Sequence, residues 1–184
     1  MAVIRKIGGI LLLAVLAACG GPPPVEEVNG VRVISRAERN AVRTVHLDAL
    51  NAFRVERGLQ PVTLSARLTA AAETHARDMS VQQRAWHFGS DGTSPDDRAA
   101  RAGFDGRVVG ENISESFDDE FEVFSSWARD PVTRRVMAEP GADSLGIGWF
   151  QEPNGKLWWV QVLGQRNTLP LLAGGDPGPF GGAL

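Results

Sequence analysis

The sequence has few of the residues that carry common catalytic chemistries. Among 184 residues there are one cysteine and three histidines, so no disulfide can form within the chain. It also lacks the Gly-x-Ser-x-Gly phrase of serine hydrolases, the His-Glu-x-x-His phrase of zinc proteases, phosphate-binding glycine loops and EF-hand loops. The formal net charge is -3 without basic clusters, which argues against nucleic acid as a partner.

The first residues have the zones of a secretory signal. Arg5 and Lys6 form a cationic start, an apolar run covers 7–16, and small residues precede Cys19. The run is too short to span a bilayer stably. Residues 16–19 read Leu-Ala-Ala-Cys, which resembles the bacterial lipobox, where the thiol is acylated and the chain is cut before the cysteine. We therefore predict a signal peptide at 1–18 and a lipid anchor with acyl chains such as palmitate on Cys19.

The remaining chain divides by composition into a body with two flanking segments. Residues 19–30 are rich in Gly, Pro and Glu and are typical of a flexible tether. Residues 166–184 are rich in Gly and Pro and are predicted to be disordered. The body, 31–165, has the length of one domain.

Hydrophobic periodicity predicts helices in the first part of the body. The phrase Ser35-x-x-Glu38 is typical of a helix start, and we expect a helix ending at Gly58 with an apolar stripe of Val42, Val45, Ala49 and Phe53. A second helix is expected after the N-cap Ser65, with Leu68, Ala72, His75 and Met79 on one face. A short helix is expected between Ser94 and Gly103, and another at about 119–129.

Strands are expected late in the body. Residues 107–114 are strand-like, and two aromatic-rich stretches, 144–151 and 156–165, flank the turn phrase Pro-Asn-Gly at 153–155. Helices followed by an antiparallel hairpin favour an α+β fold in which helices cover a small sheet.

Several phrases in order resemble one protein family. They are Leu50-Asn51-Ala52-Phe53-Arg54 with Gly58-Leu59-Gln60-Pro61, His87 before Gly89-Ser90-Asp91-Gly92, Gly110-Glu111-Asn112-Ile113, Trp127, Gly146-Ile147-Gly148 and Trp159-Val160-Gln161. Over about 47–165 the chain resembles the CAP superfamily of cysteine-rich secretory, antigen 5 and group 1 pathogenesis-related proteins, especially the short bacterial SCP-like domains without disulfides. The resemblance implies an α-β-α sandwich with a small antiparallel sheet and a shallow cleft.

The resemblance also implies a cleft site of two histidines and acidic residues. His87 matches the first histidine and Glu111 matches the acidic residue of the Gly-Glu-Asn phrase. The second histidine of the family phrase is replaced by Thr133, so two matching ligands remain where zinc normally takes at least three. His75 or Asp130 would have to complete a zinc site. His75 has a second interpretation as a hydrogen-bonded core residue, and the tryptophans are predicted to pack in the core.

Three functions stay open at this stage. The leading hypothesis is a non-enzymatic envelope protein that binds a small apolar ligand, a glycan or a protein, as the resemblance implies. The alternative is a hydrolase of envelope peptides in which His87 and Glu111 activate water, and the third is a structural spacer. Because Gly20 is not an aspartate, we expect the outer membrane facing the periplasm if the cell is Gram-negative.

Overall fold

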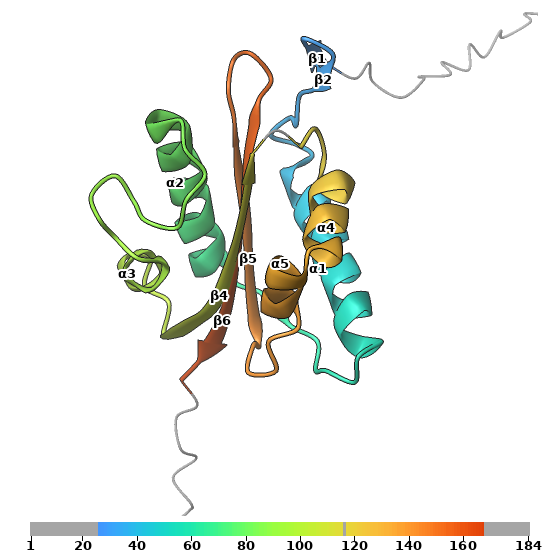
Figure 1. Ribbon diagram of the computed structural model, residues 1–184, viewed down its shortest axis with the longest axis vertical. Coiled ribbons are helices and arrows are strands. Elements are labelled where there is room, and N and C mark those ends of the chain that lie inside the picture. The colour runs from blue at the N-terminus through green and yellow to red at the C-terminus, as the bar shows by residue number, and fades with distance from the viewer. Residues whose placement is uncertain (1–25, 116, 168–184) are drawn as a thin grey trace, which may run out of the picture.

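A four-stranded sheet lies between two groups of helices (Figure 1). The computed structural model describes residues 26–115 and 117–167. The predicted signal peptide, Cys19, the tether up to residue 25 and the tail from residue 168 lie outside the described residues.

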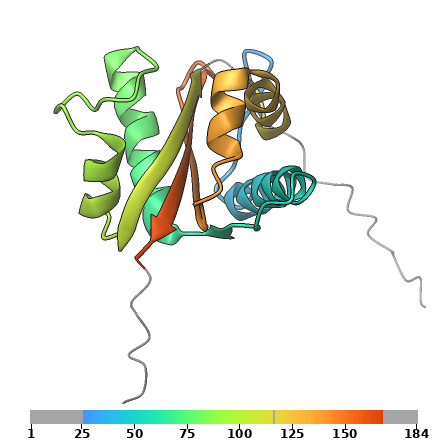
Figure 2. The same cartoon turned by 60° about the horizontal axis from the view of Figure 1, so that its bottom comes forward.

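The two helical layers are unequal. One face of the sheet carries α2 (Ala66–Gln82) and α3 (Pro95–Arg101), and the other carries α1 (Arg39–Val55), α4 (Glu120–Arg129) and α5 (Pro131–Met137). Figure 2 shows this separation along the sheet. The predicted α+β fold with an α-β-α arrangement is confirmed.

The sheet has the strand order β3-β5-β6-β4. Its strands are β3 (Thr63–Leu64), β4 (Gly106–Glu115), β5 (Ser144–Gln151) and β6 (Leu157–Arg166). β5 and β6 form the predicted antiparallel hairpin, β4 pairs antiparallel with β6, and the short β3 runs parallel to β5. Within the described residues, β5 and β6 are thus the central strands.

Register decides which face each residue of β4 serves. Glu111 pairs with Val162, which packs in the core beneath α2, whereas Asn112 pairs with Gln161 on the opposite face. Successive side chains of a strand point to opposite faces. Glu111 therefore faces α2 and α3, and Asn112 faces α5, where its side-chain amide donates to the carbonyl of Thr133 at 2.9 Å.

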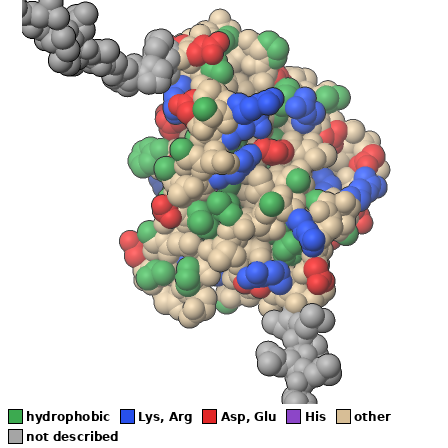
Figure 3. All heavy atoms as spheres, turned by 180° about the vertical axis from the view of Figure 1, so that it is seen from behind, with side chains coloured by type: hydrophobic (Ala, Val, Ile, Leu, Met, Phe, Trp, Pro, Cys, Tyr) green, Lys and Arg blue, Asp and Glu red, His purple; other side chains and the backbone are tan. Residues whose placement is uncertain are grey.

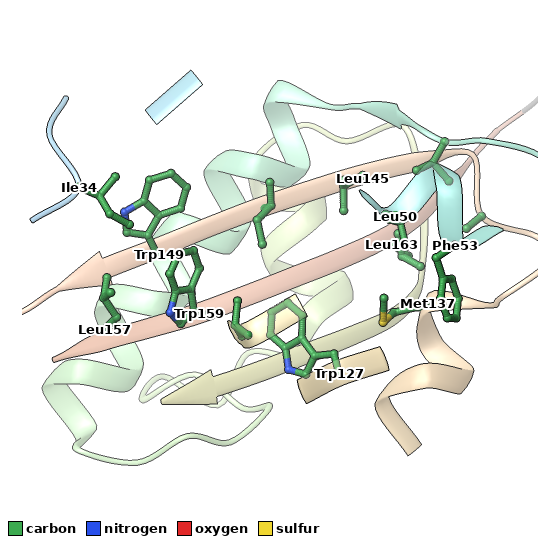
Figure 4. Packing of buried hydrophobic residues seen from close by; sticks show 14 residues of the cluster. Ile34, Leu50, Phe53, Trp127, Met137, Leu145, Trp149, Leu157, Trp159 and Leu163 are labelled. Carbon is green, nitrogen blue, oxygen red and sulfur yellow. The ribbon is translucent and has the colours of Figure 1, made fainter. Parts of the chain in front are cut away.

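The larger core lies on the α1, α4 and α5 face. Figure 4 shows Trp127, Trp149 and Trp159 there among aliphatic side chains from both strands of the hairpin. Trp158 is buried on the other face. The predicted packing role of these tryptophans is confirmed, and their burial leaves Trp86 as the partly exposed one.

The caps expected for two helices are present. The Ser65 side chain accepts from the backbone N–H of Leu68 at the start of α2, and Ser94 forms a capping box with Asp97 at the start of α3. Gly103, just after α3, has a φ of +77°, a conformation that glycine adopts at little cost. These short-range signals were sufficient to place both helices.

The stripe expected on α1 is confirmed at Phe53, which is buried, and at Val42, which packs against the core, but it is wrong at Val45. Val45 is exposed, and the buried positions are His46, Leu50, Phe53 and Arg54. Two polar side chains of α1, His46 and Arg54, are buried because each has hydrogen-bond partners in the interior. Arg54 donates to four backbone carbonyls, and His46 contacts Glu120 and Gln161. Buried polar groups are tolerated when they are hydrogen-bonded.

Four short elements were not expected. They are α5, which begins at Pro131 directly after α4, the parallel strand β3, and a ladder of β1 (Glu27–Val28) with β2 (Val31–Arg32). The ladder includes residues that composition assigned to the tether, and it closes on a turn with positive φ at Asn29 and Gly30. Within the described residues, no helix is long and apolar enough to cross a bilayer.

Candidate functional site

On the face of the sheet that α2 and α3 cover, Glu111 lies at the centre of a cluster with one arginine and two histidines. Its Oε2 accepts from Arg98 at 2.7 Å, and its Oε1 accepts from His87 Nδ1 at 2.9 Å. The Nε2 atom of His75 lies 3.9 Å from the same Oε1. The structure therefore brings together the predicted pair His87 and Glu111 and adds Arg98 and His75 to it.

Arg98 holds the carboxylate and the loop around it. One guanidinium nitrogen of Arg98 bonds Glu111, and the other donates to the carbonyls of His87 at 3.0 Å and Thr93 at 2.9 Å. Both Arg98 and Glu111 are buried, where an unpaired charge would be costly. The Arg98 side chain thus pairs with the buried Glu111 charge and also fixes the loop that carries His87.

His75 is a neutral member of the cluster. It is fully buried on α2, and its Nε2 donates to the carbonyl of Trp86 at 2.9 Å. Burial lowers the pKa of His75, Glu111 opposes this shift, and the Arg98 cation adds to it. The predicted role as a hydrogen-bonded core residue is confirmed, and the same ring also adjoins the candidate site.

His87 is the accessible member of the cluster. Its side chain is 52% exposed, whereas that of Glu111 is 2% exposed. With Nδ1 bonded to the carboxylate, the ring has its second nitrogen, Nε2, for other partners. A carboxylate that orients a histidine in this way favours one tautomer of the ring, and the pair can in principle accept a proton from a group bound outside.

Thr133 and Asp130 lie at another place in the fold. The Thr133 hydroxyl donates to the carbonyl of Trp127 at 2.9 Å, and Asp130 accepts from the backbone of Val132 and Thr133 as the N-cap of α5. These hydrogen bonds belong to the junction of α4 and α5, on the face of the sheet toward which Asn112 points. The two side chains therefore have structural partners away from the Glu111 cluster.

The donor set does not fit a zinc ion. Both oxygens of Glu111 are engaged by cationic or N–H groups, and the nearby Arg98 cation opposes the approach of another cation. Within residues 26–115 and 117–167 there is no group of three or more His, Cys, Asp or Glu side chains placed to hold a metal. His75 does not repair the set, because its Nε2 is used by the Trp86 carbonyl.

A cavity of about 410 Å³ opens between α2 and α3 beside this cluster. Its wall contains three alanines, Ala70, Ala71 and Ala102, together with a polar rim that includes Asp91 and Arg101. His75 and Arg98 belong both to the cavity wall and to the Glu111 cluster. The size lies within the range of small-molecule sites, which typically combine apolar walls with a few polar groups.

His46 forms a second buried polar group, on the other face of the sheet. His46 Nδ1 lies 3.0 Å from Glu120 Oε1, and its Nε2 lies 2.8 Å from Gln161 Oε1. These residues come from α1, α4 and β6. We interpret the group as structural, because the His46 side chain is fully buried and its ring also packs edge-on against Trp127.

Arg98 was missed by sequence reasoning. Its helix was recognised from caps alone, and an arginine in a seven-residue helix with a second arginine at Arg101 resembles an ordinary surface position. No sequence signal separates Arg98 from Arg101, because both lie in the same short helix and only the structure shows that Arg98 is buried. Arg101, in contrast, is 65% exposed.

Comparison with known families agrees with this architecture. The family model described as CAP, the cysteine-rich secretory protein family, matches residues 47–163. The chain belongs to this family. A search of curated proteins finds no match.

Solved structures of bacterial proteins share the fold. An extracellular SCP-domain protein of Bacillus anthracis has a TM-score of 0.63 at 19% identity, covering 69% of this chain and 41% of its own. An outer surface protein of Borrelia burgdorferi has a TM-score of 0.63 at 15% identity, covering 71% and 96%. A cysteine-rich secretory protein of Staphylococcus aureus has a TM-score of 0.58 at 14% identity, covering 73% and 41%. The chain thus spans less than half of the Bacillus and Staphylococcus proteins.

Proposed function

We propose that this CAP-domain protein acts outside the cytoplasm, held to the cell envelope by lipid on Cys19, and binds a small apolar ligand without catalysing a reaction. The lipobox-like phrase at 16–19 supports the anchor. The names of the Bacillus and Borrelia structures, an extracellular and an outer surface protein, support the location.

One observation carries the non-enzymatic part of the proposal. Glu111, the family's acidic residue, has both oxygens bonded to Arg98 and His87. A carboxylate used in this way holds the loop in place instead of presenting free oxygens to a metal or to water. With Thr133 in place of the second histidine, the site is better suited to forming a wall than to activating a nucleophile.

The cavity between α2 and α3 is the proposed ligand site. Its alanines provide an apolar surface, and short side chains leave the space open. The Arg101 and Asp91 side chains pair across the rim at 2.5 Å. A ligand of modest size with an apolar body and a polar end would match this arrangement of alanine walls and charged rim.

Native mass spectrometry of the protein extracted from its own envelope tests this proposal. We expect a bound small molecule in the wild type and its loss in Ala102→Leu, which fills the cavity. Ala100→Leu, an exposed position on the same helix that does not line the cavity, is the matched control and should retain the ligand. A wild-type protein without bound ligand, or equal retention in both variants, would contradict the proposal.

A second candidate is an acid-base hydrolase, because His87 is half exposed and oriented by Glu111. This function predicts cleavage of envelope peptides that His87→Ala abolishes while the unfolding midpoint stays near that of the wild type. The metal content of the purified protein at near-neutral pH distinguishes a metal-assisted hydrolase from one without metal. About one equivalent of zinc in the wild type that disappears in His87→Ala would favour the metal-assisted hydrolase. Turnover that persists in His87→Ala would remove His87 from the chemistry.

A further inference from the structure

Two large apolar side chains on neighbouring helices lack cover from the rest of the described protein. Phe121, in the first turn of α4, is 74% exposed, and Val45 of α1 is 55% exposed. Both line one hollow of about 330 Å³, to which Ile34, Ala41 and Val42 add further apolar surface. Exposed apolar side chains that gather at one place mark contact with a partner or a membrane more often than single ones do.

This hollow lies at the end of the domain where the described chain begins. Arg32 of β2 and Ile34 line it, and β2 is paired with β1 only a residue beyond Glu26, the first described residue. Figure 1 places β1 and β2 above the first turns of α1 and α4. Figure 3, seen from behind, shows hydrophobic side chains at the surface among charged ones over the whole visible face.

The length of chain between the anchor and the domain limits how far this end of the domain can lie from the bilayer. Glu26 follows Cys19 by seven positions. At about 3.3–3.6 Å per fully extended residue, that segment reaches at most about 25 Å. A lipid on Cys19 would therefore keep the hollow within one domain diameter of the bilayer surface.

The charges around the hollow favour a neutral surface over an anionic one. Arg32 is paired with Glu38, and Glu120 is paired with buried His46. Asp119 accepts from the backbone N–H of Glu122 as the N-cap of α4. The carboxylates of the rim therefore have partners, and the rim has no surplus of cations. An anionic lipid surface would require such a surplus.

We propose that the face formed by Val45 and Phe121 rests against a bilayer of zwitterionic lipids; this rests on the proposed lipid anchor at Cys19. Apolar side chains enter the headgroup region while the paired rim charges stay in water, as in interfacial helices. The two side chains alone contribute too little to hold the domain. The anchor supplies affinity, and the face sets the orientation.

The α1 helix offers a matched pair of positions for the test. Val45 and Val55 are the same residue type, 55% and 59% exposed, and ten positions apart, which is about 15 Å along a helix. Val45→Cys and Val55→Cys are prepared in the full lipidated protein, whose own Cys19 sulfur is consumed by lipid. Each new thiol is labelled with a polarity-sensitive dye, and the protein is inserted into vesicles of phosphatidylcholine and phosphatidylethanolamine.

We expect the dye at position 45 to shift to the blue and to lose intensity when a lipid quencher is placed at headgroup depth. The dye at position 55 should change little. Equal quenching at both positions in a lipidated, vesicle-bound protein overturns the face assignment alone. A blue shift at 45 that depends on protein concentration and not on the lipid quencher also overturns it, in favour of a second copy. If the wild-type protein extracted from its own envelope carries no lipid on residue 19, both proposals are overturned.

Discussion

At the scale of single residues, the buried carboxylate of Glu111 depends on Arg98. Taking either charge out of water is unfavourable unless the partner is present, and Arg98 also satisfies two loop carbonyls. Arg98→Met would leave Glu111 buried with only histidine partners. We expect the free energy of unfolding, measured by urea denaturation, to fall by about 3–5 kcal/mol.

The exposed pair of Arg101 and Asp91 is the control for this substitution. Both side chains are more than half exposed, so Arg101→Met should change the free energy of unfolding by less than about 1 kcal/mol. Adding Glu111→Gln to Arg98→Met removes the unpaired charge and should restore part of the loss. Equal effects of Arg98→Met and Arg101→Met would contradict the structural role given to Arg98.

His75 makes stability depend on pH. Burial lowers its pKa in the folded protein, so below the ordinary value of about 6.5 the unfolded chain binds a proton that the folded chain does not. The free energy of unfolding therefore falls as the pH is lowered from about 6.5 through the folded pKa, by at most about 1.4 kcal/mol per pH unit from this group. Above about 6.5 this contribution is constant.

The His75→Gln variant checks this dependence. Its side-chain amide can still donate to the Trp86 carbonyl but does not titrate. We expect a lower stability overall and a shallower decline between about pH 6.5 and pH 5 than in the wild type, measured by denaturant unfolding at fixed pH steps. Parallel declines in the two proteins would show that His75 is not the group responsible.

At the scale of elements, caps, turns and strand alternation were predictable because they depend on neighbours in sequence. Ser65, Ser94 and the turn before β6 placed their elements within a residue or two.

The buried face of α1 was not predictable, because His46 and Arg54 are buried through partners far along the chain. Arg98 was not predictable because its partners lie on a loop and a strand outside its own helix. His87 and Glu111 were accessible to prediction through the family phrase, whereas the placement of Thr133 on the other face follows from the register of β4.

The contact between α2 and β5 depends on glycine. A side-chain carbon at Gly148 would lie 2.5 Å from the Glu73 nitrogen and 2.9 Å from the Ala72 carbonyl carbon. Since these are backbone atoms of a helix, they cannot move independently. Gly148→Ala should lower the free energy of unfolding by about 1–3 kcal/mol or more through overpacking.

Gly141 is the matched control for that prediction. A side-chain carbon there would meet the flexible ends of Glu139, at 3.4 Å, and Gln165, at 3.6 Å, and its φ is not positive. Gly141→Ala should therefore leave the urea midpoint close to that of the wild type. If Gly148→Ala is tolerated as well as Gly141→Ala, then α2 does not pack on β5 as closely as described.

At the scale of the whole molecule, a family named for its cysteines is represented here by a chain with one. Hydrogen bonds tie distant segments in place of disulfides: Arg54 of α1 donates to the carbonyls of Gln60, Met137, Glu139 and Ala142. Trp149 and Trp159 of the hairpin fill the core on the face covered by α1 and α4. The described part of the fold, from residue 26, contains no cysteine.

The lipid anchor proposed for Cys19 is tested by Cys19→Ser. The described fold begins at residue 26, so we expect an unchanged circular dichroism spectrum and unfolding midpoint. Serine lacks the thiol that forms the thioether, so acylation and the cut before residue 19 should both fail. Labelled palmitate incorporation, intact mass and partition into detergent measure these steps, and Ala18→Gly, which keeps a small residue before the cysteine, should be processed like the wild type. A Cys19→Ser protein that is still cut before residue 19 and carries lipid would refute the anchor, whereas a change in its unfolding midpoint would show that the N-terminal segment contributes to the fold.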